Sequence, residues 1–521
     1  MHYWWLILPA AALASAACAG FRNGLVLNSE TAARRIAVGF AGLVFAVYFL
    51  LGWWKYGAFQ FGLWDFGIYD SMLHSTAFGE GFLRDFRGGL YDHFSPIMLV
   101  LVPFYWISDT PMHLVWFQSA ALAAGIPIMY FLAKKYLRSP EWALVLAVLY
   151  ALDPYYSRLA LYDFHSECLF PAMFLAGFLA RAYGRRGWAM ALWMACLLVK
   201  EDFVVPIFAL GFFFLFDRYE RKNGVILMAW SVFVAFFVLK VYFPCLSEKG
   251  YWHYGRYELL APTVDETVKN ALAMAGRVFR FDSFVTLSSL LLPFALLPLG
   301  HWKMFVFVLL PTLGIQLASS ADHQNYLVSH YGSALIGVVP AAALWGLRAV
   351  RVRLTRRMDG AKRLRKLALF ALVFGGTFHV ACCDLPLVRY YNYIGKWESK
   401  YHFGILSLPL RPAYYTAMFA EEVRGEELRE VFAMIPPGSR VAIQNELGAP
   451  LLRTHKLYSL PGPYDADYCL FDRELYSGFD YVTMLNDCIV RRFRDPHYRL
   501  VYRDKGILLF VRRDLTEKSR K

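Results

Sequence analysis

The stretch Gly187–Phe216, which reads GWAMALWMACLLVKEDFVVPIFALGFFFLF, decides the fold of this chain. It is apolar except for Lys200-Glu201-Asp202 at its middle. Each half is too short to cross a bilayer alone, because a helical span needs about 20 residues for ~30 Å of hydrocarbon. Basic residues flank both ends: Arg185, Arg186, Arg218, Arg221 and Lys222. We therefore expect a helical hairpin that enters the membrane and returns to the same side.

The charged tip of this hairpin predicts a polar chamber. If both basic ends face the cytoplasm, the tip lies below the far surface of the membrane. An ion at that depth costs several kcal/mol unless it lines a water-filled cavity. The tip residues Lys200, Glu201 and Asp202 therefore indicate a membrane protein whose helices enclose a hydrated space that opens to the outside.

The composition also predicts a polytopic helical membrane protein. Of 521 residues, 58% are hydrophobic, and the mean hydropathy is +0.38, which is more apolar sequence than a soluble domain of this size uses. The net charge of +14 would suit a nucleic-acid-binding protein. The Lys and Arg residues cluster in short loops between apolar segments, however, as the positive-inside rule predicts. We expect no nucleic-acid partner and a multi-pass protein of the cytoplasmic (inner) membrane.

Placing the basic loops in the cytoplasm predicts an all-α membrane domain with about 12 to 13 transmembrane helices. Segment 94–107 is short for a span, so we expect it to be re-entrant or to lie in the membrane interface; two short crossings are the alternative. The first span could instead be a signal peptide, but no basic residues precede it. The expected crossings are about 3–20, 36–54, 111–133, 141–157, 168–180, 187–199, 203–216, 225–243, 283–300, 303–318, 332–349 and 367–384.

The tail differs in composition and predicts a small extracytoplasmic α/β domain at 385–521. It follows an N-terminal span and cytoplasmic loop at 1–35 and a membrane domain at 36–384, whose large outer loop is 55–93. Within the tail we expect a helix at Ala417–Ile435, and Cys469 and Cys488 could pair in an oxidising compartment. The expected strands are Arg440–Gln444, Tyr468–Phe471, Tyr481–Leu485, Tyr498–Tyr502 and Ile507–Val511, the last two joined by a hairpin turn at Asp504-Lys505-Gly506.

Acidic and histidine-containing clusters fall almost entirely on the outer side of this topology. The topology rule counts only Lys and Arg, so a shared outward-facing chamber would explain their placement. The clusters are Asp65–Asp70, Asp92-His93, Asp163-Phe164-His165-Ser166-Glu167, Lys200-Glu201-Asp202 and His330-Tyr331.

Each cluster has a plain structural explanation beside the functional one. Asp65 can cap a helix that carries Asp70, and Asp92 suits a helix start. Lys200 can be neutralised by its neighbouring carboxylates. In the functional interpretation, Asp65 is a general base or a carboxylate that coordinates a metal. Substrate would be held by Asp92, His93, Lys200, Asp202, His330 and Tyr331.

The loop from Asp163 to Glu167 favours a metal site. Three ionisable groups within five residues are costly near the bilayer interior unless they have a role. We expect a divalent cation held by Asp163, His165 and, from the neighbouring hairpin, Glu201, with Glu167 as a further candidate. Oxygen-rich ligands suit Mg²⁺ or Mn²⁺.

Taken in order, these motifs resemble a bacterial membrane family known as domain of unknown function 2079. The resemblance covers roughly residues 36–515, and that family is similar to the type C glycosyltransferase superfamily. The matching segments are Trp64–Asp70, Asp92–Pro96, Asp163-Phe164-His165, Lys200-Glu201-Asp202, Ser329–Gly332, Gln444–Pro450 and Ala466-Asp467-Tyr468.

The resemblance implies a transferase that uses a lipid-phosphate-linked sugar on the outer face of the membrane, often with a divalent metal. Its hallmark is an acidic residue in the first large outer loop, so Asp65 is the expected catalytic carboxylate and Asp70 the second. The usual signature places two acids close together, whereas here they are spread out. A polyprenyl-phosphate sugar would enter from the bilayer lipids, with Lys200 on its phosphate. His165, Glu201 and His330 would orient donor or acceptor.

Two other classes of function remain open. A transporter or flippase for a lipid or solute would use the same chamber without breaking a bond, although the absence of an evident internal repeat counts against it. A non-catalytic assembly or sensor protein of the cell envelope would bind a partner through its tail. It predicts that Asp65→Asn and Glu201→Gln leave function intact.

Overall fold

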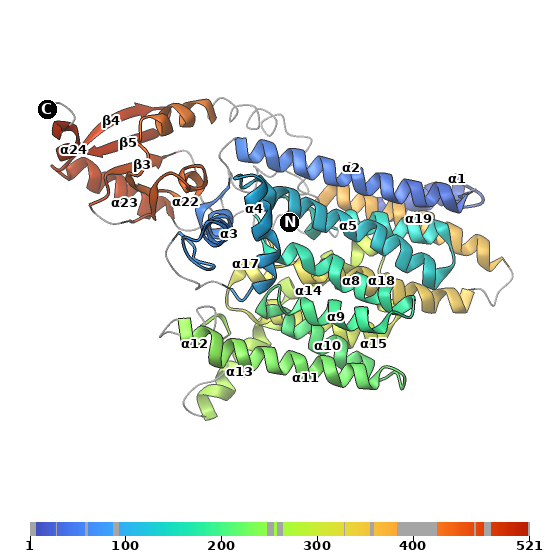
Figure 1. The fold of residues 1–521 in the computed structure, drawn as a ribbon. Coiled ribbons are helices and arrows are strands. Elements are labelled where there is room, and N and C mark those ends of the chain that lie inside the picture. The colour runs from blue at the N-terminus through green and yellow to red at the C-terminus, as the bar shows by residue number, and fades with distance from the viewer. Residues whose placement is uncertain are drawn as a thin grey trace.

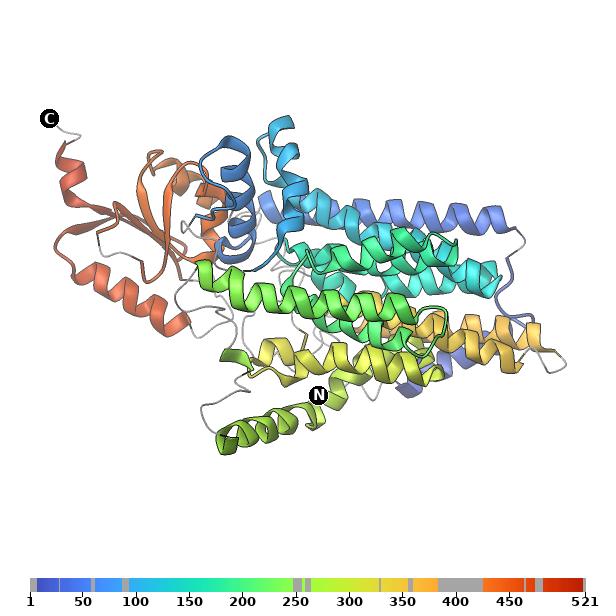
Figure 2. The ribbon, with the colours of Figure 1, turned by 60° about the horizontal axis from the view of Figure 1, so that its bottom comes forward.

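A helical bundle and a smaller sheet domain make up the molecule (Figure 1). The computed structural model describes residues 7–27, 29–57, 61–86, 93–246, 255–257, 264–327, 329–354, 359–382, 425–462, 465–473 and 481–518. The long helices run side by side, and the sheet domain lies beyond one end of them. The turned view in Figure 2 shows the same arrangement.

Among the described residues, four helical stretches are long and apolar enough to cross a membrane. They are α2 (Glu30–Gly57), α5 (Met112–Leu137), Arg221–Leu246, which begins with α11 (Arg221–Phe237), and α18 (Ser333–Leu354). A fifth candidate is α6 (Pro140–Ala151) followed by α7 (Pro154–Leu161), with a bend of 48° between them. Other expected crossings are shorter helices: α1 (Ile7–Gly20), α8 (Leu169–Ala182), α9 (Arg186–Cys196), α10 (Val204–Phe214), α14 (Phe281–Leu291) and α16 (Leu310–Ala318). The last expected crossing forms a longer helix, α19 (Gly360–Cys382), which begins with several basic residues.

The hairpin expected from Gly187–Phe216 is confirmed. Helices α9 and α10 are separated by turn residues 197–199, Lys200 and a 3₁₀ turn at Glu201–Phe203. A second 3₁₀ turn at Ser166–Cys168 precedes α8 in the same way. The Ser166 hydroxyl donates to the Val199 carbonyl at 3.0 Å, so the two turns lie together.

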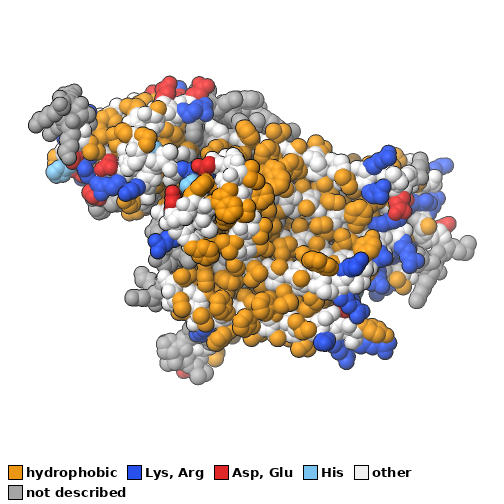
Figure 3. All heavy atoms as spheres, in the orientation of Figure 1, with side chains coloured by type: hydrophobic (Ala, Val, Ile, Leu, Met, Phe, Trp, Pro, Cys, Tyr) orange, Lys and Arg blue, Asp and Glu red, His pale blue; other side chains and the backbone are white. Residues whose placement is uncertain are grey.

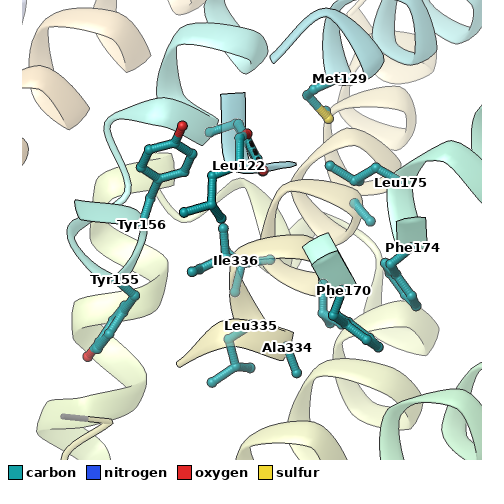
Figure 4. Close-up of a cluster of buried hydrophobic side chains, with 14 of the residues drawn as sticks. Leu122, Met129, Tyr155, Tyr156, Phe170, Phe174, Leu175, Ala334, Leu335 and Ile336 are labelled. Carbon is teal, nitrogen blue, oxygen red and sulfur yellow. Dashed lines mark hydrogen bonds between the residues drawn. The ribbon is translucent and has the colours of Figure 1, made fainter. Parts of the chain in front are cut away.

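Close packing holds the bundle together. In hydrocarbon there is little water to expel between helices, so small residues that let helices approach carry much of the association. A Cβ on Gly125 would meet the Tyr150 ring, and one on Gly177 would meet the Trp193 indole. Figure 4 shows the apolar side chains of α5, α7, α8 and α18 that fill the centre, among them Leu122, Tyr156, Phe170, Phe174 and Ile336.

The two ends of the bundle differ in charge. Figure 3 shows Lys and Arg gathered at the end away from the sheet domain, with apolar side chains over the face between. Lys134 and Lys135 end α5, Arg351 ends α18, and Arg186 and Arg221 begin α9 and α11. This is the arrangement that the positive-inside rule predicts for a cytoplasmic end.

Segment 94–107 forms two short consecutive helices, η3 (Pro96–Leu101) and α4 (Val102–Ile107). They lie beside α3 (Ile68–Phe78), and the Trp106 indole donates to the Ala77 carbonyl at 2.8 Å. Trp106 and Ile107 are exposed. The segment is among the shorter apolar helices rather than a full-length span.

The C-terminal domain carries a five-stranded sheet of order β2-β1-β3-β5-β4. Strand β1 (Arg440–Ile443) is parallel to β2 (Lys456–Ser459) and β3 (Tyr468–Asp472); β5 (Ile507–Arg512) is antiparallel to β3 and to β4 (Tyr498–Asp504). Residues 425–433 are helical, within the expected Ala417–Ile435. The expected hairpin turn is confirmed, with positive φ at Lys505 and Gly506.

One expectation for this domain was wrong, and one possible disulfide is not formed. Tyr481–Leu485 is not a strand but the start of α23 (Tyr481–Arg494), whose apolar residues Leu485, Ile489 and Phe493 recur at helical rather than alternating spacing. Cys469 and Cys488 are free thiols. Burial raises the pKa of the Cys469 thiol to about 12.

Candidate functional site

The candidate site lies where the bundle meets the C-terminal domain. Asp65 sits in a π-helical turn, η2 (Leu63–Gly67), that leads into α3. His165 lies in the loop between α7 and α8, Lys200 precedes the turn that begins α10, and His330 precedes α18. Each of these residues is at the end of a helix, so four distant segments of the chain bring their polar groups to one place.

The Asp65 carboxylate is held but remains accessible. The Tyr162 hydroxyl donates to Oδ2 at 2.7 Å, and His165 Nε2 lies 3.5 Å from Oδ1. The Asp65 side chain is 31% exposed. His165 Nδ1 lies 3.0 Å from the Asp163 carbonyl, which assigns the proton to Nδ1 and turns Nε2 toward Asp65. A carboxylate so fixed at the edge of a buried cluster is suited to accept a proton from a bound hydroxyl.

A continuous row of charged and imidazole groups leads inward from Asp65. The His165 and His330 rings stack with centroids 3.8 Å apart, and His330 Nε2 lies 3.8 Å from Glu167 Oε1. Lys200 Nζ is 2.7 Å from the same carboxylate oxygen and 3.7 Å from Asp202 Oδ2. The structure thus joins residues from four of the motifs, and Lys200 acts as the counter-ion of Glu167.

These loop groups have shifted pKa values. Burial disfavours the charged imidazole of His165, but the carboxylates of Glu167 and Asp65 outweigh it and raise its pKa to about 8. Burial likewise disfavours ionised Glu167, but Lys200, His165 and His93 outweigh it and lower its pKa to about 2. The charged forms of His165 and Glu167 are therefore favoured, because each lies beside an opposite charge.

One group of side chains fits a metal ion among the described residues. Ligand atoms of His165, Glu167 and His330 all lie within 4.8 Å of one another. Two imidazole nitrogens and one carboxylate oxygen suit Mn²⁺ or Zn²⁺ better than Mg²⁺. Lys200 already neutralises Glu167, so a cation there would share that carboxylate with an ammonium. Of the expected ligands Asp163, His165 and Glu201, this group contains only His165.

Asp163 instead serves the loop that precedes Asp65. Its Oδ1 accepts from Lys55 Nζ at 2.6 Å and its Oδ2 from the Gly62 backbone N–H at 2.6 Å. Both members of the Lys55–Asp163 pair are buried. The pair ties the end of α2 to the α7–α8 loop, and so fixes the distance between Asp65 and His165.

Glu201 pairs with His93. His93 Nδ1 is 2.6 Å from Glu201 Oε1, and the Phe94 backbone N–H donates to Oε2 at 2.9 Å. This pair lies one residue from Lys200, beside the row described above. Asp92 lies outside the described residues. Tyr331, which stands next to His330, accepts a hydrogen bond from Arg256 at 3.2 Å.

Asp70 lies apart from Asp65, in a salt bridge between the two domains. Its carboxylate accepts from Arg453 Nη2 at 2.6 Å, from Arg453 Nε at 3.1 Å and from the Tyr105 hydroxyl at 2.9 Å. Arg453 also pairs with Asp109. The side chain of Asp70 is buried, and the expected second catalytic carboxylate is thus occupied by a cation from the C-terminal domain.

Sequence reasoning missed several partners of these residues. Gln118 of α5 accepts from the His165 backbone N–H at 3.0 Å and donates to the carbonyls of Leu159 and Tyr162. A lone amide within an apolar helix is a usable signal. Tyr162 and Arg453 gave no such signal, because tyrosines are common near membrane interfaces and arginines are common in a basic tail.

Comparisons with known proteins bear on family and fold. The family model described as "Predicted membrane protein (DUF2079)" matches residues 55–485. No curated protein matches the chain. ArnT from Cupriavidus metallidurans, in a crystal structure bound to undecaprenyl phosphate, is similar with a TM-score of 0.47 and 13% identity over 91% of this chain and 98% of that one. The Archaeoglobus fulgidus oligosaccharyltransferase in the apo form gives 0.41 and 13% over 92% and 74%.

Proposed function

The chain belongs to the DUF2079 family of membrane proteins, and on that premise we propose that it is a glycosyltransferase. It moves a sugar from a polyprenyl-phosphate donor to an acceptor hydroxyl on the outer face of the membrane. The observation that carries the proposal is the partly exposed Asp65 carboxylate, held by Tyr162 and next to His165 at the edge of a buried charged row. The C-terminal domain, at the end opposite the basic loops, lies outside the cytoplasm.

In the proposed reaction Asp65 acts as the general base. It takes the proton of the acceptor hydroxyl while that oxygen forms a bond to the anomeric carbon of the donor sugar. The bond between the anomeric carbon and the phosphate oxygen breaks, and polyprenyl phosphate leaves with the electron pair. The Tyr162 hydroxyl donates to the carboxylate and so fixes its orientation.

Two cationic side chains lie near the position proposed for the leaving phosphate. Arg256 extends to the Tyr331 hydroxyl, and the Lys200 ammonium lies 5.9 Å from the Tyr331 ring. Both cations are therefore near Tyr331, beside His330. A divalent cation held by His165, Glu167 and His330 would supply further positive charge to the phosphate oxygens. The lipid donor would reach this site from the bilayer alongside the bundle.

A reconstitution assay tests the proposal. Purified protein in liposomes is given a set of radiolabelled polyprenyl-phosphate sugars and a hydroxyl acceptor such as a membrane glycolipid. Release of polyprenyl phosphate by the wild type and its loss in Asp65→Asn are expected. Movement of intact labelled lipid across the bilayer without release would instead support a flippase. Neither release nor movement, with partner binding unaffected by Asp65→Asn, would support the assembly or sensor protein.

A further inference from the structure

The tail motif Gln444–Pro450 has no part in the proposed reaction, yet it lies against the turn that bears Asp65. It follows strand β1 and contains the short helix α22 (Asn445–Gly448). Figure 1 shows α22 at the edge of the C-terminal domain that faces α3. The motif is therefore placed to act on the segment around Asp65.

Two hydrogen bonds from the neighbour of Asp65 reach into the C-terminal domain. The Trp64 backbone N–H donates to Asn445 Oδ1 at 2.7 Å, and the Trp64 indole donates to Ser459 Oγ at 2.9 Å. The first N–H groups of any helical turn lack partners within it and need an outside acceptor. Gly62 precedes this turn and has no side chain to offer, so Asn445 supplies the capping oxygen from 381 residues away.

Steric contacts leave little freedom at this junction. A Cβ on Gly62 would lie 2.9 Å from Asp163 Oδ2 and 3.0 Å from Asn445 Nδ2. A Cβ on Gly448 would lie 3.0 Å from the Leu63 side chain. Leu63 itself is fully buried in the apolar cluster of the C-terminal domain. The turn is thus held in two ways: Asn445 caps its backbone, and Leu63 is buried in the C-terminal domain.

We infer that Asn445 is a positioning residue for Asp65. Its side chain fixes the backbone of the π turn, and so sets the direction in which the carboxylate points. Asp65 adjoins Trp64, so a loose turn would displace the carboxylate from its Tyr162 and His165 partners. Displacements of about 1 Å can lower a rate by roughly 100-fold. The kinetic part of this inference rests on the proposed function, whereas the effect on the turn does not.

Hydrogen exchange of the full-length protein in detergent tests the structural part. In Asn445→Ala, exchange in peptides that cover residues 61–67 should be faster by about tenfold or more, because the Trp64 amide loses its acceptor. Asn486→Ala, at an exposed asparagine of α23, is the matched control and should leave these peptides unchanged. Wild-type exchange rates in Asn445→Ala would overturn the inference, whatever the protein is found to catalyse.

Steady-state kinetics test the functional part. Asn445→Ala should lower kcat for polyprenyl-phosphate-sugar cleavage by about 10- to 100-fold, with KM for the donor within about twofold. Gly62→Ala should give the same split, and the double variant should be no worse than the poorer single one. An unchanged kcat in Asn445→Ala, in a wild type that is active, would overturn the inference. A wild type that cleaves no donor would instead count against the proposed function, and the exchange result would still decide the role of Asn445.

Discussion

Asp65 and Asp70 belong to one short motif, yet the structure gives them opposite surroundings. Asp65 is 31% exposed and is held by a tyrosine and a histidine of the bundle. Asp70 is buried and grips Arg453 of the C-terminal domain with both oxygens. The difference teaches that two acids in one motif need not act as a pair: Asp65 remains accessible beside the buried row, whereas Asp70 joins two domains.

The largest effect should come from Asp65→Asn. The amide keeps the size of the carboxylate and can still accept from Tyr162, but it cannot take a proton, so sugar transfer should fall by about 1,000-fold or more. The thermal unfolding temperature in detergent should stay close to that of the wild type. Asp487→Asn, at an exposed carboxylate of α23, serves as control. If Asp65→Asn retained sugar transfer, Asp65 would not be the general base, and the proposed difference in role between Asp65 and Asp70 would be wrong.

Arg453→Met should have the next largest effect, on stability instead. It leaves the Asp70 carboxylate buried without its cation, which costs about 3–5 kcal/mol. Chemical or thermal unfolding in detergent measures the loss. Lys505→Met, which breaks the exposed Lys505–Glu427 pair of the same domain, should change stability little. Equal losses of stability in both variants would mean that the Asp70–Arg453 pair stabilises the protein no more than a surface ion pair does.

Tyr162→Phe should have a smaller effect, and only on the Asp65 side of the comparison. The change deletes one hydroxyl that donates to the proposed base Asp65, and kcat should fall by about tenfold, consistent with a hydrogen bond to a charged group. Donor and acceptor KM values should stay near those of the wild type. A stability loss without a change in kcat would assign Tyr162 to packing alone.

Tyr105→Phe should have the smallest effect, and only on the Asp70 side. It removes the hydroxyl that donates to Asp70 Oδ1 but leaves Arg453 in place, so unfolding free energy should fall by about 1 kcal/mol. Transfer activity per folded molecule should be unchanged. A drop in activity larger than the drop in stability would show that Asp70 also contributes to the reaction.

Much of the fold follows from the sequence because apolar length and charge placement are local signals. The hairpin around Lys200 needs only the lengths of two apolar runs and the basic residues that flank them. Strand β2 was missed because Lys456–Ser459 carries little apolar signal: one of its four residues is buried, whereas β1, which is equally short, buries three. At Tyr481 five residues that begin with an aromatic and two β-branched side chains suited a strand as well as a helix, and the longer helical period was decisive.

The site was harder to predict than the fold, because pairing is a long-range property. The sequence shows that Asp65, His165, Lys200 and His330 lie at helix ends on one side, and the structure brings them into one row. The sequence does not show which carboxylate pairs with which cation. Asp163 and Glu167 are four residues apart in one loop, yet one pairs with Lys55 and the other with Lys200.

The burial of Leu63 inside the C-terminal domain has a consequence for biosynthesis. The ribosome completes the Asp65 segment long before Asn445 and Arg453, which lie 381 and 383 residues beyond their partners. During that interval the nascent chain can insert its helices, but the turn that carries Asp65 lacks the Asn445 cap and the apolar cluster that buries Leu63. A chain shortened by a premature stop codon would therefore reach the membrane without these contacts, and only a finished polypeptide would hold the Asp65 turn in place.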